Sequence, residues 1–347
     1  MRPIHRAAGV AGLALLPLLA ACAGDDPSSG DDGAAAEGER LVVYSGRSEN
    51  LVQPLIDEFE EETGIAVDVR YDGTTALAAL LLEEGDRTPA EVFLSQDAGA
   101  LGAVADAGLF APLPDDVVQA VPAGYTSTDG NWTGITGRAR VLVYDGQEID
   151  EADLPDSVQG LTDPEWGGRV GIPPTNASFQ SFVTAFRVLE GEDAAREWLE
   201  AMVENDVERY ESNVPILEAV NDGRLDVGLI NHYYWYQTAA EVGEENMRAQ
   251  LAFLPPGDPG SLVNVTGAGI LTGAAEDPEA LELVRYLVSD AGQRYFVENT
   301  YEYPLVPGIE APEGLPRLEE LRNPDLDLAD LDSLQETVEL LASVGLT

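Results

Sequence analysis

The stretch that decides the fold is residues 41–71, LVVYSGRSENLVQPLIDEFEEETGIAVDVRY, where two strand patterns flank a helix pattern. Residues 41–44 are an apolar run of strand length, and the apolar residues between Leu51 and Phe59 recur at helical spacing until Gly64. Residues 66–71 alternate between apolar and polar side chains, as a second strand does. The order strand, helix, strand predicts a β-α-β unit with parallel strands.

The same alternation continues along the chain, and it predicts an α/β fold with doubly wound sheets. In such sheets ligands bind beyond the carboxyl ends of the strands, and short polar segments stand at these ends, at 46–48, 72–74 and 95–97. Further strands are expected at 91–94, 141–144, 169–172, 227–230 and 261–271, with helices at 76–84, 99–107, 178–189, 194–204, 278–288 and 292–298.

An aromatic run, Asn-His-Tyr-Tyr-Trp-Tyr at 231–236, follows the strand pattern at 227–230, and a helix pattern covers 234–245. Neighbouring side chains in a first helical turn diverge by only about 100°, so two consecutive phenols can converge on one ligand. Free N–H groups at a helix start favour an anion beside them. We interpret Tyr233 and Tyr234 as ligands of a small trivalent cation such as Fe(III), which holds phenols ionised at neutral pH. The alternative is an aromatic core cluster, which the polar side chains of Asn231 and His232 make less suitable.

Five strings carry a resemblance to a known family: INHYYW (230–235), YSGRSEN (44–50), TPAEVFLSQD (88–97), GRARVLVYD (137–145) and SDAGQRYFVENTYEYPLV (289–306). From residue 41 onward the chain resembles the ferric-iron-binding proteins of bacterial ABC importers. The resemblance implies a hinged, two-lobe solute-binding protein of the periplasmic binding protein-like type II class, with the ligand cleft between two α/β lobes. We expect residues 41–137 and 264–312 to form the first lobe, and 138–263 and 313–347 to form the second lobe, which carries the tyrosines.

The iron site that the resemblance implies has paired tyrosines on one lobe, a histidine and a glutamate on the other, and a small anion. Tyr233 and Tyr234 match the pair. Ser48 stands where the histidine is expected, and Gln96 stands where the glutamate is expected. We interpret Ser48 as a cap of the following helix and Gln96 as a hydrogen-bonding group across the closed cleft, so both are possible first-lobe contacts rather than ligands.

The anion side of the implied site is represented by three asparagines. Asn176, Asn213 and Asn231 stand where family members use Ser or Asn to hold phosphate or carbonate, although each alone suits a turn. Arg47 and Arg138 can add charge to the same anion by bidentate contact. The alternative for these arginines is a surface ion pair in a very acidic protein.

The N-terminal residues 1–21 have the pattern of a lipoprotein signal peptide, with Arg2 and Arg6 before an apolar segment and small residues before Cys22. We expect Cys22 to be acylated, the alternative being an ordinary cleaved signal. Residues 22–40 are small, polar and acidic, which predicts a disordered tether. Cys22 is the single cysteine of the chain, so no intramolecular disulfide can form, and with His232 as the one histidine after the signal a zinc site is not expected.

The composition is strongly acidic, with 64 Asp and Glu against 18 basic residues, all of them Arg, and a formal net charge of −46. The lack of Lys excludes a Walker-A phosphate loop and a Schiff-base lysine. The charge repels nucleic acid and anionic membrane surfaces. We interpret the acidic excess as a solvated surface, of the kind that suits a high-salt habitat.

Together these features predict an extracytoplasmic lipoprotein, anchored to the cell membrane through Cys22, that binds Fe(III) with carbonate or phosphate and delivers it to the permease and ATPase of an ABC importer. We expect a monomer that does not bind nucleic acid and is not an enzyme. One alternative keeps the fold and binds a small anionic organic or phosphorylated solute. A second is an extracytoplasmic hydrolase, against which stand the missing G-x-S-x-G motif and histidine cluster. A third is a passive adhesion lipoprotein.

Overall fold

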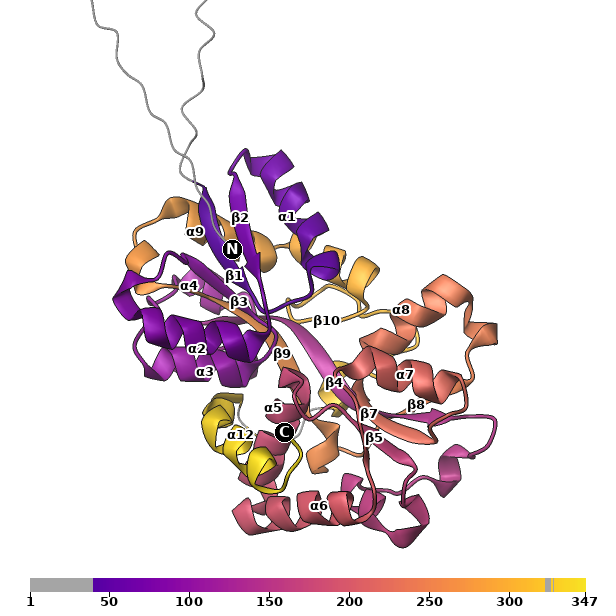
Figure 1. Cartoon of the computed structure of the whole chain (residues 1–347). Helices are drawn as coiled ribbons and strands as arrows, with labels where there is room; N and C mark the ends of the chain where they lie inside the picture. The colour runs from indigo at the N-terminus through magenta and orange to yellow at the C-terminus, as the bar shows by residue number, and fades with distance from the viewer. Residues whose placement is uncertain (1–39, 322–325, 327) are drawn as a thin grey trace, which may run out of the picture. The chain divides into compact units, whose positions relative to one another are not determined.

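The computed structural model describes residues 40–347, except 322–325 and 327 (Figure 1). The predicted signal peptide, Cys22 and the predicted tether up to residue 39 lie outside the described residues. In the described part of the chain, no helix has the length and apolarity needed to cross a membrane.

One long strand, β4 (Thr133–Asp145), belongs to two groups of strands. Its first half pairs with β9 (Val263–Ile270) and with β10 (Tyr303–Pro304). Its second half pairs with β7 (Val227–Asn231) and with β8 (Ala249–Ala252). We call the strands around the first half the first strand group and those around the second half the second strand group.

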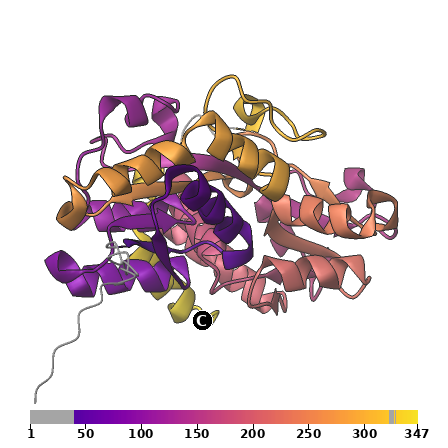
Figure 2. The same cartoon turned by 90° about the horizontal axis from the view of Figure 1, so that it is seen from above.

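The first strand group begins with the predicted β-α-β unit. β1 (Leu41–Ser45) pairs in parallel with β2 (Val67–Tyr71) and β3 (Val92–Ser95), so the predicted parallel arrangement is confirmed. β9 lies antiparallel to β3 and connects the unit to β4. Helices cover both faces of the strands (Figures 1 and 2). One core is covered by α1 (Glu49–Thr63), α9 (Pro278–Leu287), α10 (Asp290–Tyr295) and the short α4 (Asp115–Val118). The other core is covered by α2 (Thr74–Glu84) and α3 (Ala98–Asp106).

The second strand group places β5 (Val170–Ile172) between β7 and β6 (Glu208–Arg209), again in parallel. The side chains of Phe182, Phe186 and Trp198 form a buried ring cluster, with centroids 5.4–6.2 Å apart, that holds two helices together. The helices of this group are α5 (Ala177–Glu190), α6 (Glu192–Glu204), α7 (Asn213–Asn221) and α8 (Tyr233–Val242).

The C-terminal segment contacts helices next to both strand groups. The 3-10 turn at residues 328–332 packs on α3, and the backbone oxygen of Leu331 lies so close to Gly99 that a Cβ there would be 2.6 Å from it. α12 (Leu334–Ser343) packs on α5, where the hydroxyls of Thr184 and Thr337 are 2.7 Å apart. α11 (Leu318–Leu321) precedes this segment.

Two differences from the sequence-based boundaries bear on the candidate site. The strand expected at 141–144 is the end of the thirteen-residue β4, whose first half is rich in Gly and Thr and is a strand because β9 and β10 pair with both of its edges. The helix expected at 234–245 runs from Tyr233 to Val242. Both tyrosines of the pair therefore lie in the first helical turn.

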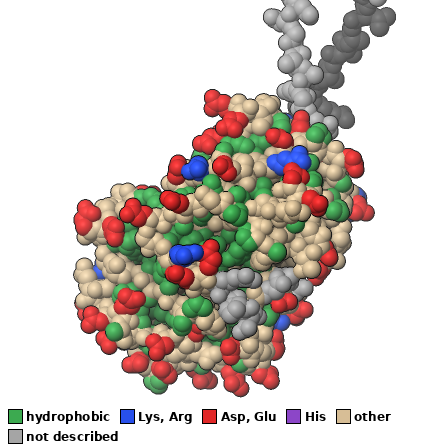
Figure 3. Space-filling model, turned by 180° about the vertical axis from the view of Figure 1, so that it is seen from behind, with side chains coloured by type: hydrophobic (Ala, Val, Ile, Leu, Met, Phe, Trp, Pro, Cys, Tyr) green, Lys and Arg blue, Asp and Glu red, His purple; other side chains and the backbone are tan. Residues whose placement is uncertain are grey.

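Acidic side chains are scattered over the face seen in Figure 3, and blue Arg side chains on it are few. This distribution agrees with the interpretation of the acidic excess as a solvated surface. The arginines that matter for the site are buried, as described below.

Candidate metal and anion site

Tyr233 and Tyr234 are the first two residues of α8, directly after the buried strand β7. Their ring centroids are 4.2 Å apart with an angle of 33° between the rings. Tyr233 is fully buried and Tyr234 is partly buried. Burial, and then the neighbouring phenol of Tyr233, raise the pKa of Tyr234 well above its usual value of 10. The phenol of Tyr234 therefore ionises at neutral pH only beside a strong positive charge.

A buried cluster of one arginine, one serine and three asparagines lies near the pair; we call it the asparagine cluster. Nη1 of Arg140 donates to Oγ of Ser178 at 3.1 Å, to Oδ1 of Asn231 at 3.3 Å and to Oδ1 of Asn213 at 3.4 Å. Oδ1 of Asn176 accepts from Oγ of Ser178 at 2.6 Å and from Nδ2 of Asn213 at 3.3 Å. The structure therefore brings together all three predicted asparagines, around an arginine that the sequence analysis did not single out.

The backbone explains why these residues meet. Arg140 on β4 is the register partner of Asn231 on β7, so their side chains lie on the same face of the sheet. Asn176 caps α5, where its Oδ1 accepts from the N–H of Ser178 at 3.0 Å, and Asn213 is the first residue of α7. The start of α5, the start of α7 and the end of β7 thus each supply one asparagine to the cluster.

In the part of the chain that the structure describes, no carboxylate forms a hydrogen bond or ion pair with Arg140. Its guanidinium lies over the rings of Phe179 and Phe182, at 5.5 and 5.7 Å from the centroids. Among the described residues, its Nε and Nη2 have no hydrogen-bond partner. Burial, and then the charge of Arg138, lower the pKa of Arg140 to about 9. A buried cation with free N–H groups is a favourable neighbour for an anion.

Polar side chains continue along the same face of β4 as a row. Thr136, Arg138 and Arg140 alternate on this strand, and Thr266 and Asn264 stand opposite the first two on β9. All five are buried. Nε and Nη1 of Arg138, Nδ2 of Asn264 and Oγ1 of Thr266 find no hydrogen-bond partner in the described part of the chain. The row therefore holds several unused donors, and Arg138 within it lies in electrostatic reach of Tyr234.

Arg47 comes from the first strand group and is also buried. Its Nη2 donates to Oε1 of Glu302 at 2.6 Å, and Oε2 of the same carboxylate accepts from Oγ1 of Thr136 at 2.6 Å. The guanidinium lies 5.8 Å from the ring centroid of Tyr233. Burial opposes the charge of Arg47, but Glu302 and the two tyrosines outweigh it and keep the pKa above its usual value. The alternative of a surface ion pair is wrong for Arg47, since both partners are inside, and Arg138 is buried as well.

The two first-lobe positions expected near the metal behave differently from the expectation. Ser48 occupies the N-cap position of α1 but is exposed, and its side chain makes no capping hydrogen bond, so the predicted cap is wrong. Gln96 is half-buried, and its backbone N–H donates to Oγ1 of Thr74 at 3.1 Å. A hydrogen bond between the helices of the two strand groups is made instead by Oγ1 of Thr75 and Oε1 of Gln180, at 3.1 Å.

His232 directly precedes the tyrosine pair, but both ring nitrogens of its side chain form hydrogen bonds to the backbone. Its Nδ1 accepts from the backbone N–H of Ala139 at 3.2 Å, so the proton of the neutral ring is on Nε2, which donates to the carbonyl of Tyr301 at 2.9 Å. Burial lowers the pKa of His232 to about 4. Of the described residues, no three His, Cys, Asp or Glu side chains come close enough together to hold a metal ion. Phenol oxygens are therefore the metal-binding groups that this site offers.

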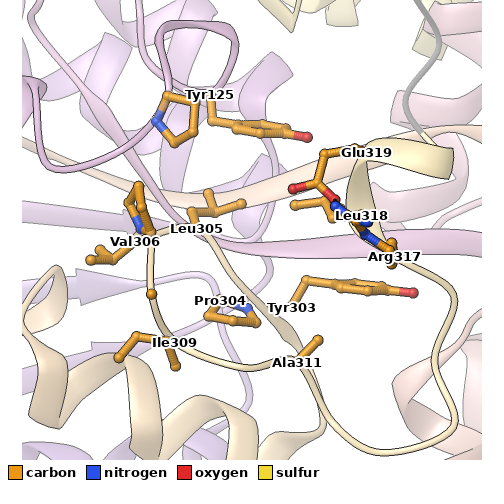
Figure 4. Close-up of a pocket in the computed structure, with 13 residues that line it drawn as sticks. Tyr125, Tyr303, Pro304, Leu305, Val306, Ile309, Ala311, Arg317, Leu318 and Glu319 are labelled. Carbon is orange, nitrogen blue, oxygen red and sulfur yellow. The ribbon is translucent and has the colours of Figure 1, made fainter.

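Two surface hollows lie away from the tyrosine pair. One of about 510 Å³ is bounded by β10, by the chain that follows it and by residues of α11, with Tyr125, Tyr303 and Leu305 on its wall (Figure 4). Another of about 560 Å³ is lined by Trp235, Tyr236 and residues of β8. Neither includes Tyr233, Tyr234 or a member of the asparagine cluster.

A family described as bacterial extracellular solute-binding protein matches residues 87–329, which include β4, the asparagine cluster and the tyrosine pair. The chain belongs to this family. Membership explains the arrangement of two strand groups, and the predicted two-lobe architecture of this class is confirmed.

Individual members of the solute-binding family are similar over most of their length. The Fe(3+)-binding periplasmic protein of Serratia marcescens is 35% identical over 314 residues, covering 90% of this chain and 92% of that protein. The crystal structure of iron-bound HitA from Pseudomonas aeruginosa has a TM-score of 0.83 at 36% identity, covering 88% of this chain and 99% of that one. A Trichodesmium protein in complex with iron and citrate has a TM-score of 0.73 at 25% identity, covering 89% and 100%. The resemblance to ferric-iron-binding proteins is confirmed.

Two residues of the candidate site, Arg140 and Glu302, were not predicted from the sequence. Arg140 had a detectable signal, because it stands two positions after Arg138 in a strand pattern and must share its face. Glu302 had none, because it is 255 residues away from the arginine that it pairs with.

Proposed function

We propose that this protein binds one Fe(III) ion between its strand groups through the phenolate oxygens of Tyr233 and Tyr234, together with carbonate or phosphate. The observation that carries the proposal is the pair itself, two phenol rings 4.2 Å apart in one helical turn and within electrostatic reach of Arg47 and Arg138. Relatives of similar length that are named for ferric iron support it.

The electrostatics of the pair favour a trivalent cation as cargo. A free phenol ionises near pH 10, and burial moves the pKa of Tyr234 further upward, so two phenolates form here only if a strong positive charge repays the loss of hydration. Phenolate oxygens are hard ligands and suit Fe(III). Two of them leave the ion with one positive charge.

The remaining charge calls for an anion. Glu302 neutralises Arg47 and Asp97 attracts Arg138, but Arg140 has no carboxylate beside it. One charge from the bound ion and one from Arg140 are balanced by a dianion such as carbonate or hydrogen phosphate. We expect the free N–H groups of Arg140 and Arg138, with the asparagine cluster and Arg47 beside them, to hold that anion.

Because Ser48 and Gln96 stand where a histidine and a glutamate are expected, the anion has to contribute more to the coordination of iron. Neither residue brings an imidazole or a carboxylate to the ion, so water and the anion fill the coordination positions that the tyrosines leave open. Since Tyr233 has no exposed surface, iron reaches it only when the strand groups separate. We place this opening at the exchange of iron with the permease of an ABC importer and its ATPase, with the binding protein a monomer held to the cell membrane through Cys22.

A small anionic organic or phosphorylated solute without iron is the second candidate. The unpaired N–H groups of Arg138 and Arg140 favour it, because they bind a carboxylate or a phosphate ester whether or not a metal is present. The two candidates differ in whether the phenols are ionised.

An absorption spectrum separates them. Addition of ferric citrate to the purified protein is expected to produce a visible phenolate-to-iron charge-transfer band, which Tyr233→Phe and Tyr234→Phe each bleach or shift while the fold is kept. Tyr210→Phe is a matched control, because this half-buried tyrosine donates its hydroxyl to Oε2 of Glu208 at 2.7 Å and lies outside the site. A colourless ferric-loaded protein, or the same band in all variants, would refute iron binding by the pair and leave the anionic solute.

A further inference from the structure

The imidazole of His232 replaces one backbone group in the hydrogen bonds between β7 and β4. Up to Asn231 the two strands pair in regular register, and then the chain turns into α8. The backbone N–H of His232 still donates to the carbonyl of Ala139 at 3.0 Å, while Nδ1 of its ring accepts the N–H of Ala139 at 3.2 Å. The ring thus closes the end of the strand pair and has Nε2–H left for another partner.

That partner is the carbonyl of Tyr301, 2.9 Å away, in a segment that contacts both strand groups. Tyr301 has a left-handed backbone with φ of 59°, which is uncommon for a residue with a Cβ, and its ring stacks on Tyr236 of α8 at 6.0 Å. The next residue, Glu302, holds Arg47. Tyr303 then pairs with Gly137 of β4, and its ring lies 5.1 Å from that of His232.

The segment 301–303 therefore links the tyrosine pair to the arginine of the opposite group. On one side it contacts His232, whose neighbour in the chain is Tyr233, and on the other it holds Arg47, which stands over the ring of Tyr233. A left-handed conformation at Tyr301 persists only where the surroundings over-determine it. The bond from His232 is the side-chain contact that fixes its carbonyl.

We propose that His232 is a positioning residue which, through its bond to the Tyr301 carbonyl, couples the tyrosine pair to Arg47 and thereby slows the release of iron. This inference rests on the proposed function of the pair. The bond to Ala139 serves the strand pairing, whereas the bond to Tyr301 keeps the segment, and with it Arg47, in a fixed relation to the phenols.

Two substitutions separate the two bonds of the ring. In His232→Asn the short amide oxygen can take the place of Nδ1 and accept from Ala139, but nothing reaches Tyr301. In His232→Gln the longer amide nitrogen can take the place of Nε2 and donate to Tyr301, but the N–H of Ala139 loses its acceptor. The measurement is the rate at which a competing chelator removes iron, followed by the decay of the charge-transfer band, together with the thermal midpoint of each variant.

We expect His232→Asn to lose iron about tenfold faster than wild type, because a buried carbonyl is left without its donor, and His232→Gln to stay within about twofold. Hydrogen exchange gives a second readout. Iron loading should slow amide exchange in residues 299–304 of the wild type and of His232→Gln, but not of His232→Asn. Packing alone predicts neither difference.

Gln237→Ala is the matched control. Gln237 also lies on α8 and donates to the carbonyl next to that of Tyr301, Thr300, at 3.3 Å, so its removal loosens the same helix from the same chain. We expect it to release iron at the wild-type rate.

Several results would overturn the inference: His232→Asn releasing iron like wild type, Gln237→Ala releasing it as fast as His232→Asn, or release rates that follow the thermal midpoints. Should His232→Asn fail to fold, His232→Gln still decides, since faster release by that variant contradicts the assignment. A wild type without a charge-transfer band would remove the proposed function and this inference with it, whereas a normal band with unchanged release removes the inference alone.

Discussion

The two strand groups contribute to the candidate site in opposite ways. The second group supplies the tyrosine pair and the asparagine cluster, in which the guanidinium of Arg140 contacts neutral side chains. The first group supplies a buried ion pair, Arg47 with Glu302. At positions 48 and 96, where relatives are expected to place ligands, it has only Ser and Gln.

The contacts within each strand group indicate which half of the candidate site is preorganised. Side chains that are hydrogen-bonded among themselves keep their geometry without cargo, so the second group is preorganised for the proposed iron and anion. In the first group the Arg47–Glu302 ion pair lies beside the ring of Tyr233 and positions 48 and 96 offer no imidazole or carboxylate, so this group would contribute less to direct coordination. Substitutions in the two groups are therefore expected to have different effects.

The largest effect is expected at the carboxylate of the first group's ion pair. Glu302→Gln leaves the guanidinium of Arg47 buried without its counter-charge and should lower the free energy of unfolding by about 3–5 kcal/mol. Thr136→Val removes the other hydrogen bond of that carboxylate and should cost only about 2 kcal/mol. Urea denaturation of both variants checks this; equal losses would mean that the charge of the pair is unimportant.

The second prediction concerns pH and the phenols of the second group. The pKa of Tyr234 lies well above 10, so the unliganded phenol is protonated at all physiological pH values and iron binding must release its proton. If both tyrosines ionise on binding, the affinity for iron should fall about a hundredfold for each unit by which the pH is lowered, because each phenol contributes a factor of about ten. Chelator competition at several pH values, corrected for the chelator's own protonation, measures the slope, and Tyr234→Phe should halve it. An affinity that does not change with pH is incompatible with phenolate ligands.

A third test converts the first group into one that supplies a ligand. Gln96→Glu adds a carboxylate where the relatives are expected to have one and should tighten iron by about tenfold to a hundredfold, while the need for carbonate or phosphate becomes smaller. Gln119→Glu adds the same charge at an exposed site on the same group and controls for net charge. Chelator titrations with and without the anion measure both effects. Wild-type affinity that ignores the anion would contradict the proposed charge balance.

The smallest effect is expected at Ser48. Because its side chain makes no capping hydrogen bond, Ser48→Ala should change the free energy of unfolding by less than about 0.5 kcal/mol. Ser289→Ala is the matched change at a serine that does cap its helix, with Oγ accepting from Gly292 at 3.2 Å, and should cost about 1 kcal/mol. Thermal denaturation compares the two. A loss at Ser48 as large as at Ser289 would restore its capping role.

The sequence predicted those parts of the molecule that depend on local patterns. The β-α-β unit and the strand before the tyrosine pair follow from periodicity. The meeting of three asparagines from separate segments was implied by the family resemblance. Sequence patterns failed where distant segments decide. The first half of β4 is a strand because β9 and β10 pair with it, and Arg47 is buried in an ion pair with Glu302, 255 residues further along the chain. The position of Arg140 on the same face as Arg138 could have been predicted from the two-residue period of a strand.

β4 also sets how the two strand groups can move. Its thirteen residues run through both groups, a length of about 40 Å, with hydrogen-bonded neighbours along its edges. Such a strand cannot bend sharply at one residue without breaking its hydrogen bonds to the neighbouring strands. Separation of the two strand groups therefore has to be spread as small changes of twist over many residues.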